Sequence, residues 1–218
     1  MKLMIVDDHQ VVRQGIANLL RSLLPAVAIT EIENGQEAVA RYGELRPDVV
    51  LLDVGLPDIS GLEVGRRIRQ RWRGAAILFF TMHDELPMVR QALDVGGLGF
   101  VSKSCAPEEL AEAVKRVAAG QPYIEHPIAT RLAMNRERPV DHRLKDMTQR
   151  EMEVLLMYVR GESVTGIAKR LCVSNKTVSN HLAGLKSKLQ VASSVELIHL
   201  AVDAGLIRYG QLGESRRV

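Results

Sequence analysis

Residues 49–61 read Val49-Val50-Leu51-Leu52-Asp53-Val54-Gly55-Leu56-Pro57-Asp58-Ile59-Ser60-Gly61. The four apolar residues at the start are typical of a buried strand, and the Pro and Gly residues that follow predict a loop. Asp53 places a charge at the end of this strand, where burial is costly unless another group pairs with it. In open α/β sheets, ligands bind at this end of the strands. The stretch therefore predicts a strand whose end carries a site around Asp53.

Apolar runs that predict strands alternate with helical patterns over the first 120 residues. In the helical patterns, apolar residues recur at intervals of three and four. Five strands that alternate with five helices predict a doubly wound parallel sheet with helices on both faces. The predicted strands cover residues 3–6, 27–29, 49–52, 76–80 and 99–102, and the predicted helices cover 11–23, 38–42, 62–68 and 86–95, with a fifth beginning at Pro107.

Polar groups stand at the ends of four of these strands. Asp7 and Asp8 follow the first strand, Asp53 follows the third, Thr81 ends the fourth and Lys103 follows the fifth. The carboxyl ends of parallel strands share one edge of the sheet, so we expect these groups to converge. Repulsion among three carboxylates favours a hard cation such as Mg²⁺, and a hydroxyl and an ammonium group suit phosphoryl oxygens. Since a carboxylate can attack phosphorus, the set predicts a phosphoryl-accepting site.

The balance of charge changes along the chain. From Pro139 onward there are 12 Lys and Arg residues against 8 Asp and Glu, whereas the remainder holds 17 against 18. A basic second half indicates a unit that meets a polyanion. Between the two halves, residues 121–146 include Pro122 and Pro127 and predict a linker with room for one short helix. We therefore expect two domains, at 1–120 and 147–210.

The second of these domains is predicted to be all-α, with four helices. Thr148 and Glu151 form a capping-box pattern at the start of the first helix. The third helix, 175–189, has one apolar stripe and an opposite face that is polar and basic, and a short turn at Cys172 joins it to the second. Two short helices joined in this way predict a DNA-binding helix-turn-helix. On charge alone, a plain helical bundle is an equal alternative.

Residues 1–120 resemble the receiver domain of bacterial two-component response regulators. The resemblance rests on Asp7-Asp8-His9, the stretch 53–61, Thr81-Met82-His83-Asp84 and Gly99-Phe100-Val101-Ser102-Lys103. It implies a flavodoxin-like fold in which Asp53 accepts the phosphoryl group. It also implies that Thr81 and Lys103 bind this group and that Phe100 is an aromatic side chain that rotates. The implied Mg²⁺ ligands are Asp7, Asp8, Asp53 and the backbone carbonyl of Gly55.

The sequence departs from the usual receiver pattern at two positions. Ser104 stands where a Pro often follows the lysine, and Gly55 stands where a larger side chain is common. The small residue at position 55 opens the space beside Asp53, so we expect it to affect the lifetime of the phosphoryl group.

Residues 147–207 resemble the LuxR-type DNA-binding domain. The matching text includes Thr148-x-Arg150-Glu151, Ile167-Ala168, Lys176-Thr177-Val178-x-Asn180-His181 and Lys188-Leu189-x-Val191. In that family the third helix enters the DNA, which implies a DNA-binding face made of Lys176, Thr177, Ser179, Asn180, Ala183 and Lys186. Ser179, Asn180 and Ala183 are expected to face the bases, and Lys176 and Thr177 to lie near phosphate.

Together, the two resemblances indicate a response regulator of the NarL/FixJ class. They imply that a sensor histidine kinase phosphorylates Asp53, and that homodimers then bind palindromic half-sites in double-stranded DNA. We expect a cytoplasmic transcription regulator that is not an enzyme. No apolar run reaches the ~18 residues of a membrane span. The chain has two cysteines, Cys105 and Cys172, and their wide separation suits a reducing compartment.

Two other functions fit parts of the sequence. A Mg²⁺-dependent phosphohydrolase with an aspartyl-phosphate intermediate also uses Asp, Thr and Lys. Such an enzyme typically needs a second acid two residues after its nucleophile, and this chain has Gly55 there. The other alternative is a DNA-binding protein that is never phosphorylated. It is opposed by the completeness of the predicted pocket, which consists of Asp7, Asp8, Asp53, Thr81 and Lys103.

Overall fold

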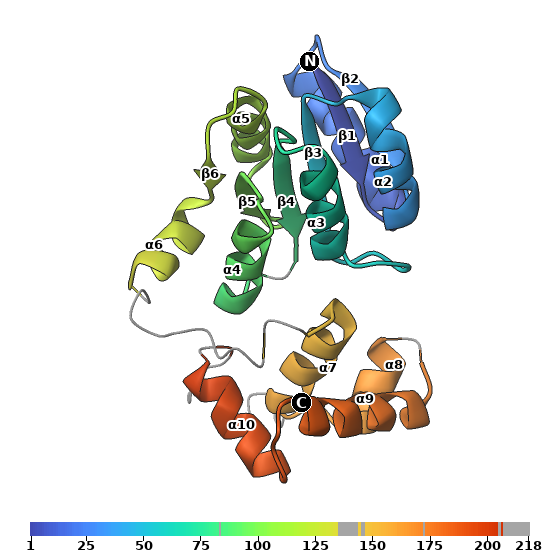
Figure 1. Cartoon of the computed structure of the whole chain (residues 1–218), viewed down its shortest axis with the longest axis vertical. Helices are drawn as coiled ribbons and strands as arrows, with labels where there is room; N and C mark the ends of the chain where they lie inside the picture. The colour runs from blue at the N-terminus through green and yellow to red at the C-terminus, as the bar shows by residue number, and fades with distance from the viewer. Residues whose placement is uncertain (83, 135–143, 145–146, 172, 205, 207–218) are drawn as a thin grey trace. The chain divides into compact units, whose positions relative to one another are not determined.

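The computed structural model describes residues 1–82, 84–134, 144, 147–171, 173–204 and 206. The chain forms two compact units, Met1–Met134 and Asn135–Val218 (Figure 1). Four of the predicted features fall outside the described residues. They are the linker residues 135–143 and 145–146, His83 of the third receiver motif, the turn residue Cys172, and the end of the second domain at 207–210.

The first unit is built on a six-stranded sheet in the order β2-β1-β3-β4-β5-β6, and every neighbouring pair is parallel. The predicted doubly wound α/β fold is confirmed, but the sheet has one strand more than the five predicted. Strand β6 has only two residues, too few to produce a periodic pattern. The strands are β1 (Lys2–Val6), β2 (Ala28–Ile32), β3 (Val49–Leu52), β4 (Ile77–Thr81), β5 (Gly99–Ser102) and β6 (Tyr123–Ile124).

Helices pack on both faces of this sheet. On one face, α1 (Gln10–Leu23) and α5 (Pro107–Ala118) share a buried apolar core with alternate strand residues such as Leu51 and Leu78. Successive strand residues point to opposite faces, so Phe79 turns away from that core and lies against Gly65 of α3. The helices of this second face are α2 (Gly35–Leu45), α3 (Gly61–Arg71) and α4 (Leu86–Asp94).

A further helix, α6 (His126–Met134), follows β6 and contacts α4. It falls within the stretch predicted as a linker, 121–146, and belongs to the first compact unit. Its position beside α4 can be followed in Figure 1. Among the helices in the described part of the chain, none is long and apolar enough to cross a membrane.

Within its described residues the second unit has four helices, as predicted, and each begins at a hydroxyl-bearing cap. The Thr148–Glu151 capping box is confirmed, because each side chain bonds the other residue's backbone N–H. Each of the four helices buries apolar residues, and Leu155, Ile167, Val178 and Leu197 are fully buried. The helices are α7 (Gln149–Val159), α8 (Val164–Arg170), α9 (Asn175–Lys188) and α10 (Ser194–Asp203).

Candidate functional site

The register of the sheet brings the predicted pocket residues together. Val6 pairs with Leu52, so the acids that follow them, Asp7 and Asp53, lie side by side at one edge. The Asp53 N–H also donates to the Val6 carbonyl at 2.9 Å. Both side chains are buried, with only 2% of Asp7 and 6% of Asp53 exposed. Two buried carboxylates that lie side by side need a compensating positive charge.

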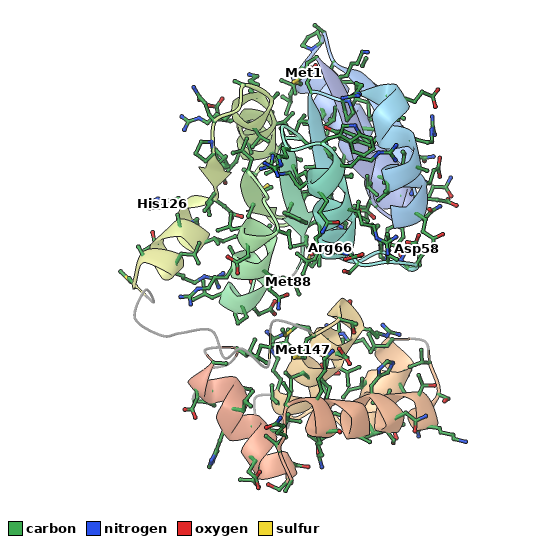
Figure 2. All side chains as sticks on the ribbon, in the orientation of Figure 1. Met1, Asp58, Arg66, Met88, His126 and Met147 are labelled. Atoms are coloured by element: carbon green, nitrogen blue, oxygen red, sulfur yellow. The ribbon has the colours of Figure 1, made fainter. Side chains whose placement is uncertain are left out.

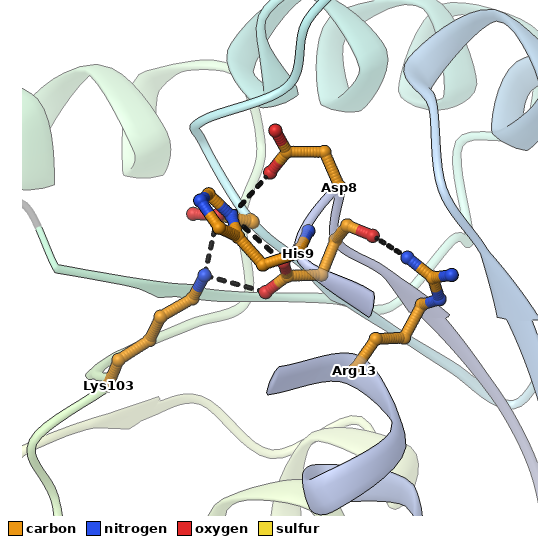
Figure 3. A network of polar contacts seen from close by, with 6 residues as sticks. Asp8, His9, Arg13 and Lys103 are labelled. Atoms are coloured by element: carbon orange, nitrogen blue, oxygen red, sulfur yellow. Dashed lines mark hydrogen bonds and ion pairs between the residues drawn. The ribbon is translucent and has the colours of Figure 1, made fainter. Parts of the chain in front are cut away.

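Lys103 supplies that charge. Its Nζ atom lies 2.6 Å from Oδ2 of Asp7 and 2.6 Å from Oδ2 of Asp53, so it bridges the two acids (Figure 3). Burial by itself would lower the pKa of the lysine, but the charges and hydrogen bonds of Asp53 and Asp7 outweigh it and raise the pKa. Lys103 therefore remains an ammonium ion, held between the two acids.

Asp8 and His9 form the outer part of the cluster. The Nδ1 atom of His9 lies 2.7 Å from Oδ1 of Asp8, and its backbone N–H donates to Oδ1 of Asp7 at 2.8 Å. Burial raises the pKa of Asp8, while the neighbouring His9 lowers it by less. Its Oδ1 atom is buried, and apart from this contact with His9 it accepts no hydrogen bond from the described residues.

The donor atoms of this cluster suit a hard divalent cation. One atom from each of Asp7, Asp8, His9 and Asp53 lies within 4.8 Å of the others. Carboxylate oxygens are the ligands that Mg²⁺ prefers, whereas an imidazole nitrogen is a ligand for softer metals. The buried Oδ1 atom of Asp8 gives such a cation an oxygen with spare bonding capacity. The three aspartates therefore suit Mg²⁺ as ligands, whereas His9 lies beside them without being a suitable ligand.

Thr81 and Phe100 belong to β4 and β5, two of the strands whose ends form the pocket. Thr81 is 1% exposed and its backbone carbonyl accepts the N–H of Lys103 at 2.9 Å. Phe100 is fully buried in β5 and pairs with Phe79 of β4. Gly55 is partly buried in the loop that follows Asp53. The predicted pocket residues therefore lie at this edge of the sheet, and Phe100 lies on β5, one of the strands that lead to it.

The loop after Asp53 is tightly folded. Gly61 donates its N–H to the carbonyl of Val54 at 2.9 Å, and a Cβ atom on Gly61 would lie 2.0 Å from the carbonyl oxygen of Asp53. Asp58, labelled in Figure 2, accepts hydrogen bonds from the first backbone N–H groups of α2, those of Gly35 at 2.9 Å and Gln36 at 2.8 Å. The loop is thus tied to a helix on the same side of the pocket.

Sequence reasoning missed one buried residue of the pocket. Arg13 on α1 is only 9% exposed, and its Nη1 atom donates to the backbone carbonyl of Asp7 at 2.5 Å. Arg13 and Lys103 reach the acidic network from opposite sides (Figure 3). A basic residue on an amphipathic helix usually faces solvent, so its spacing gave no signal. The one feature of the sequence that could have indicated this contact is that Arg13 follows Asp7 by only six residues.

The predicted DNA-binding residues lie on α9 and differ in how free they are. Lys176, Ser179, Asn180 and Ala183 are exposed. Thr177 is partly buried, and its hydroxyl is hydrogen-bonded to that of Ser174 at 2.8 Å. α9 therefore presents a surface of small polar and apolar groups with Lys176 near its start.

The lysines of α9 are not equivalent. Lys186 donates to the hydroxyl of Ser194 at 3.2 Å, and Lys188 pairs with Glu151 at 2.7 Å. Lys176 has no partner among the described residues. Of the three lysines on this helix, Lys176 is therefore the one most available to a phosphate.

Comparisons with known proteins agree with both units. Residues 3–115 match the family model "Response regulator receiver domain", and residues 145–201 match "Bacterial regulatory proteins, luxR family". The chain is 49% identical over 211 residues to the transcriptional activator protein ExaE of Pseudomonas putida, which covers 95% of this chain and 99% of that protein. It is 34% identical over 205 residues to the response regulator UvrY of Escherichia coli, which covers 93% and 94% of the two chains.

Solved structures give the same result. The response regulator RcsB of Salmonella typhimurium superposes with a TM-score of 0.57 at 26% identity, over 91% of this chain and 96% of that one. A LuxR-family response regulator from Aurantimonas superposes with a TM-score of 0.60 at 38% identity, over 62% of this chain and 96% of that one. The chain therefore belongs to the two-component response regulators that join a receiver domain to a LuxR-type DNA-binding domain and regulate transcription.

Proposed function

We propose that Asp53 is the phosphoacceptor of this response regulator. In the proposed reaction, Asp53 attacks the phosphorus of a sensor kinase's phosphohistidine, so that an O–P bond forms as the N–P bond breaks. The observation that carries the proposal is the convergence of Lys103 on Asp7 and Asp53, at 2.6 Å from each. An ammonium group at this point can neutralise the charge of the transferred group.

The neighbouring residues have separate roles in this proposal. The ammonium group of Lys103 pairs with the phosphoryl oxygens, and the Thr81 hydroxyl donates a hydrogen bond to one of them. Thr81 moves toward the phosphoryl group in this proposal, and Phe100 turns into the space that Thr81 leaves. Mg²⁺, held by Asp7, Asp8, Asp53 and the backbone carbonyl of Gly55, would neutralise the negative charge that gathers on the reacting oxygens.

In this proposal, residues 1–120 are the phosphorylated domain and residues 147–210 the DNA-binding domain, joined by 121–146. The exposed face of α9 enters the major groove of double-stranded DNA. Asn180 suits an adenine edge, Ser179 either kind of base, and Ala183 a thymine methyl group. Lys176, Thr177 and Lys186 meet the phosphate backbone.

We also propose that phosphorylation promotes a homodimer on paired, palindromic half-sites. Support comes from the complexes of RcsB with DNA, which include a structure of two RcsB dimers on two DNAs. A twofold dimer would match a palindromic site. We place this activity in the cytoplasm, where the reducing conditions suit two separated cysteines.

We further propose that Asp53 is a reversible switch and has no substrate turnover of its own. The alternatives are a phosphohydrolase and a DNA-binding protein that is never phosphorylated. A small phosphodonor such as acetyl phosphate, added with Mg²⁺ to the full chain, separates the three. Intact-mass measurement should find one phosphoryl adduct that outlasts removal of the donor.

The matched variants are Asp53→Asn and Asp94→Asn, because Asp94 is an exposed carboxylate on α4. The first should abolish the adduct and the second should retain it. An adduct that survives Asp53→Asn contradicts the assignment, and a chain that takes up no phosphoryl group supports the phosphorylation-independent alternative. Steady release of phosphate from a phosphate monoester supports the phosphohydrolase.

A second measurement addresses the DNA-binding half. Selection of DNA from a random pool, with and without the phosphodonor, should yield a twofold-symmetric motif that the phosphorylated chain binds more tightly. Sedimentation of the same samples should report whether a dimer forms on phosphorylation. Equal affinity in both samples would contradict control by phosphorylation.

A further inference from the structure

The segment formed by residues 123–134, which we call the trailing segment, contains β6, Glu125 and α6. It lies beyond residues 3–115, the part that matches the receiver family model. Its backbone nevertheless extends the receiver sheet, because β6 pairs with β5 through Gly99–Tyr123 and Phe100–Ile124. Its side chains reach two loops that carry residues of the phosphoryl-acceptor pocket.

The first connection runs from Glu125 to the end of β5. Glu125 is only 9% exposed, and its Oε2 atom accepts the backbone N–H of Ser102 at 2.7 Å. Its own N–H donates to the carbonyl of Phe100 at 3.1 Å. A buried carboxylate that accepts a backbone N–H forms a strong, charge-assisted hydrogen bond. Glu125 thus fixes the residue that directly precedes Lys103.

The same turn is held from its other side. The hydroxyl groups of Ser102 and Ser104 lie 2.7 Å apart, and Ser104 donates its N–H to the Ser102 hydroxyl at 3.2 Å. Lys103 stands between these two serines. Its backbone is therefore anchored while its long side chain extends into the acidic pocket.

The second connection runs from α6 to the loop after β4. Arg131 donates through Nη2 to the backbone carbonyl of Asp84 and, at 2.9 Å, to its Oδ2 atom. Asp84 is three residues beyond Thr81, whose hydroxyl is assigned to the phosphoryl group. The pair is partly exposed, with 35% of the Arg131 side chain and 43% of the Asp84 side chain accessible. This contact joins α6 to the loop that must follow any displacement of Thr81.

We propose that Glu125 and Arg131 are positioning residues for phosphoryl transfer to Asp53. Glu125 acts through the turn that carries Lys103, and Arg131 acts through the loop that follows Thr81. The inference rests on the proposed function of Asp53 and names two residues that this function does not itself require. Coupling between two sites is reciprocal, so a phosphoryl group that shifts these loops also changes how firmly the trailing segment is held.

The test uses the full chain, acetyl phosphate and Mg²⁺. Three quantities are measured for each variant: the rate of adduct formation by intact mass, the rate of adduct loss after removal of the donor, and the Mg²⁺ affinity by calorimetry. Glu125→Ala removes the acceptor of the Ser102 N–H, whereas Glu125→Gln keeps an amide oxygen that can accept it. Arg131→Met removes the contact with Asp84, and Arg131→Lys keeps the charge.

We expect Glu125→Ala and Arg131→Met each to change the rate of adduct formation or loss about fivefold, the lower end of ordinary coupling between sites. Glu125→Gln should restore most of the loss. Mg²⁺ affinity should stay near the wild-type value in all four variants, because Glu125 and Arg131 contact Ser102 and Asp84 and supply none of the proposed metal ligands. Asp84→Ala combined with Arg131→Met should add little to either single change.

The control is Arg41→Met. Arg41 forms a partly exposed pair with Glu37 within α2, at 2.8 Å, and α2 belongs to neither loop. Wild-type rates in both Glu125→Ala and Arg131→Met would overturn the inference. So would a parallel loss of rate and Mg²⁺ affinity in Glu125→Ala that Gln does not rescue, since that pattern reports general loss of structure.

The partly exposed Arg131 pair keeps the test decisive if Glu125→Ala does not fold. Failure of the proposed function gives a different result, because the wild-type chain itself would then form no adduct on Asp53.

Discussion

The ammonium nitrogen of Lys103 lies 2.6 Å from the Oδ2 atom of Asp53, although 50 positions separate the two residues in the chain. The ends of two parallel strands bring them together, one on either side of β4. The contact places a buried positive charge against the carboxylate that the proposed reaction modifies.

Replacing Lys103 with Met should make the stability of the fold depend on Mg²⁺. Loss of the bridging charge leaves Asp7 and Asp53 unpaired, and breaking a buried ion pair costs about 3 kcal/mol or more of unfolding free energy. Added Mg²⁺ should recover much of that loss, because a cation can replace the ammonium charge. Urea unfolding with EDTA and with Mg²⁺ measures both effects. Lys115→Met, at an exposed position on α5, is the control, and equal stability of the two variants in EDTA would contradict the prediction.

Replacing Asp58 with Ala should destabilise the chain more at neutral pH than in acid. Burial raises the pKa of Asp58, but the N–H groups of Gln36 and Gly35 outweigh it and lower the pKa below the ordinary 3.8. With a depressed folded-state pKa, the stabilisation is fully present above about pH 4 and is lost as the pH falls through the lower folded value. Losing a helix cap costs about 1 kcal/mol. Unfolding of both proteins from pH 7 to pH 3 should show their difference shrink, and a constant difference would argue against a charged cap.

Replacing Gly61 with Ala should disrupt the loop beside Asp53. The added Cβ atom would lie 2.0 Å from the Asp53 carbonyl oxygen, so the loop must shift. We expect a loss of about 2 kcal/mol of unfolding free energy, as for other overpacked sites, and slower phosphorylation. Gly74→Ala is the matched control, since a Cβ atom there meets nothing within 4 Å. Equal effects of the two substitutions would show that the contact is unimportant.

The thiol of Cys105 should react slowly with alkylating reagents at neutral pH. Burial, with smaller contributions from the Glu125 and Glu109 carboxylates, raises its pKa to about 11. Only the thiolate reacts, so alkylation at pH 8 should be about 100-fold slower than for a thiol with an unshifted pKa. A Cys172→Ser background isolates the signal of Cys105. Iodoacetamide labelling that matches the rate of the urea-unfolded chain would contradict this prediction.

Two lysines of α9 should respond differently to substitution. Lys176→Ala should reduce the slope of log affinity for DNA against log salt concentration by about 0.9, the change expected for one lost phosphate contact. Lys188→Ala should leave that slope unchanged and lower stability instead, because Lys188 pairs with Glu151. Burial raises the pKa of Glu151, but the hydrogen bonds from Lys188 and Thr148 outweigh burial and lower it. Fluorescence anisotropy at several salt concentrations, together with urea unfolding, distinguishes the two. Matching slopes for both variants would contradict the assignment of Lys176.

The central part of the fold could be predicted because buried strands appear in the sequence as runs of apolar residues. Strand β3 is buried on both faces and reads as an unbroken apolar run, so its bounds were correct. Strand β2 extends further than predicted, to Ile32. The prediction ended at residue 29 because Thr30 and Glu31, which are only partly buried, interrupt the apolar run. Predictions of which groups meet at the edge needed only the parallel order of the strands.

The missed residues are charged side chains whose partners are backbone atoms or distant in sequence. Arg13 bonds the Asp7 carbonyl, Glu125 bonds the Ser102 N–H, and Arg131 bonds Asp84, 47 positions away. Charged residues usually face water, so their spacing carries no information about such contacts. Only the folded chain reveals that these three charges are used internally.

Strand β6 has a practical consequence for work on the isolated receiver. It covers the outer backbone of β5 with a strand of two residues, and short edge strands resist unwanted pairing with other chains. A fragment that ends at residue 120 would expose the N–H and C=O groups of β5 to a neighbouring molecule, whereas one that ends at Met134 keeps them covered. The shorter fragment should therefore self-associate as its concentration rises, and the longer one should remain monodisperse.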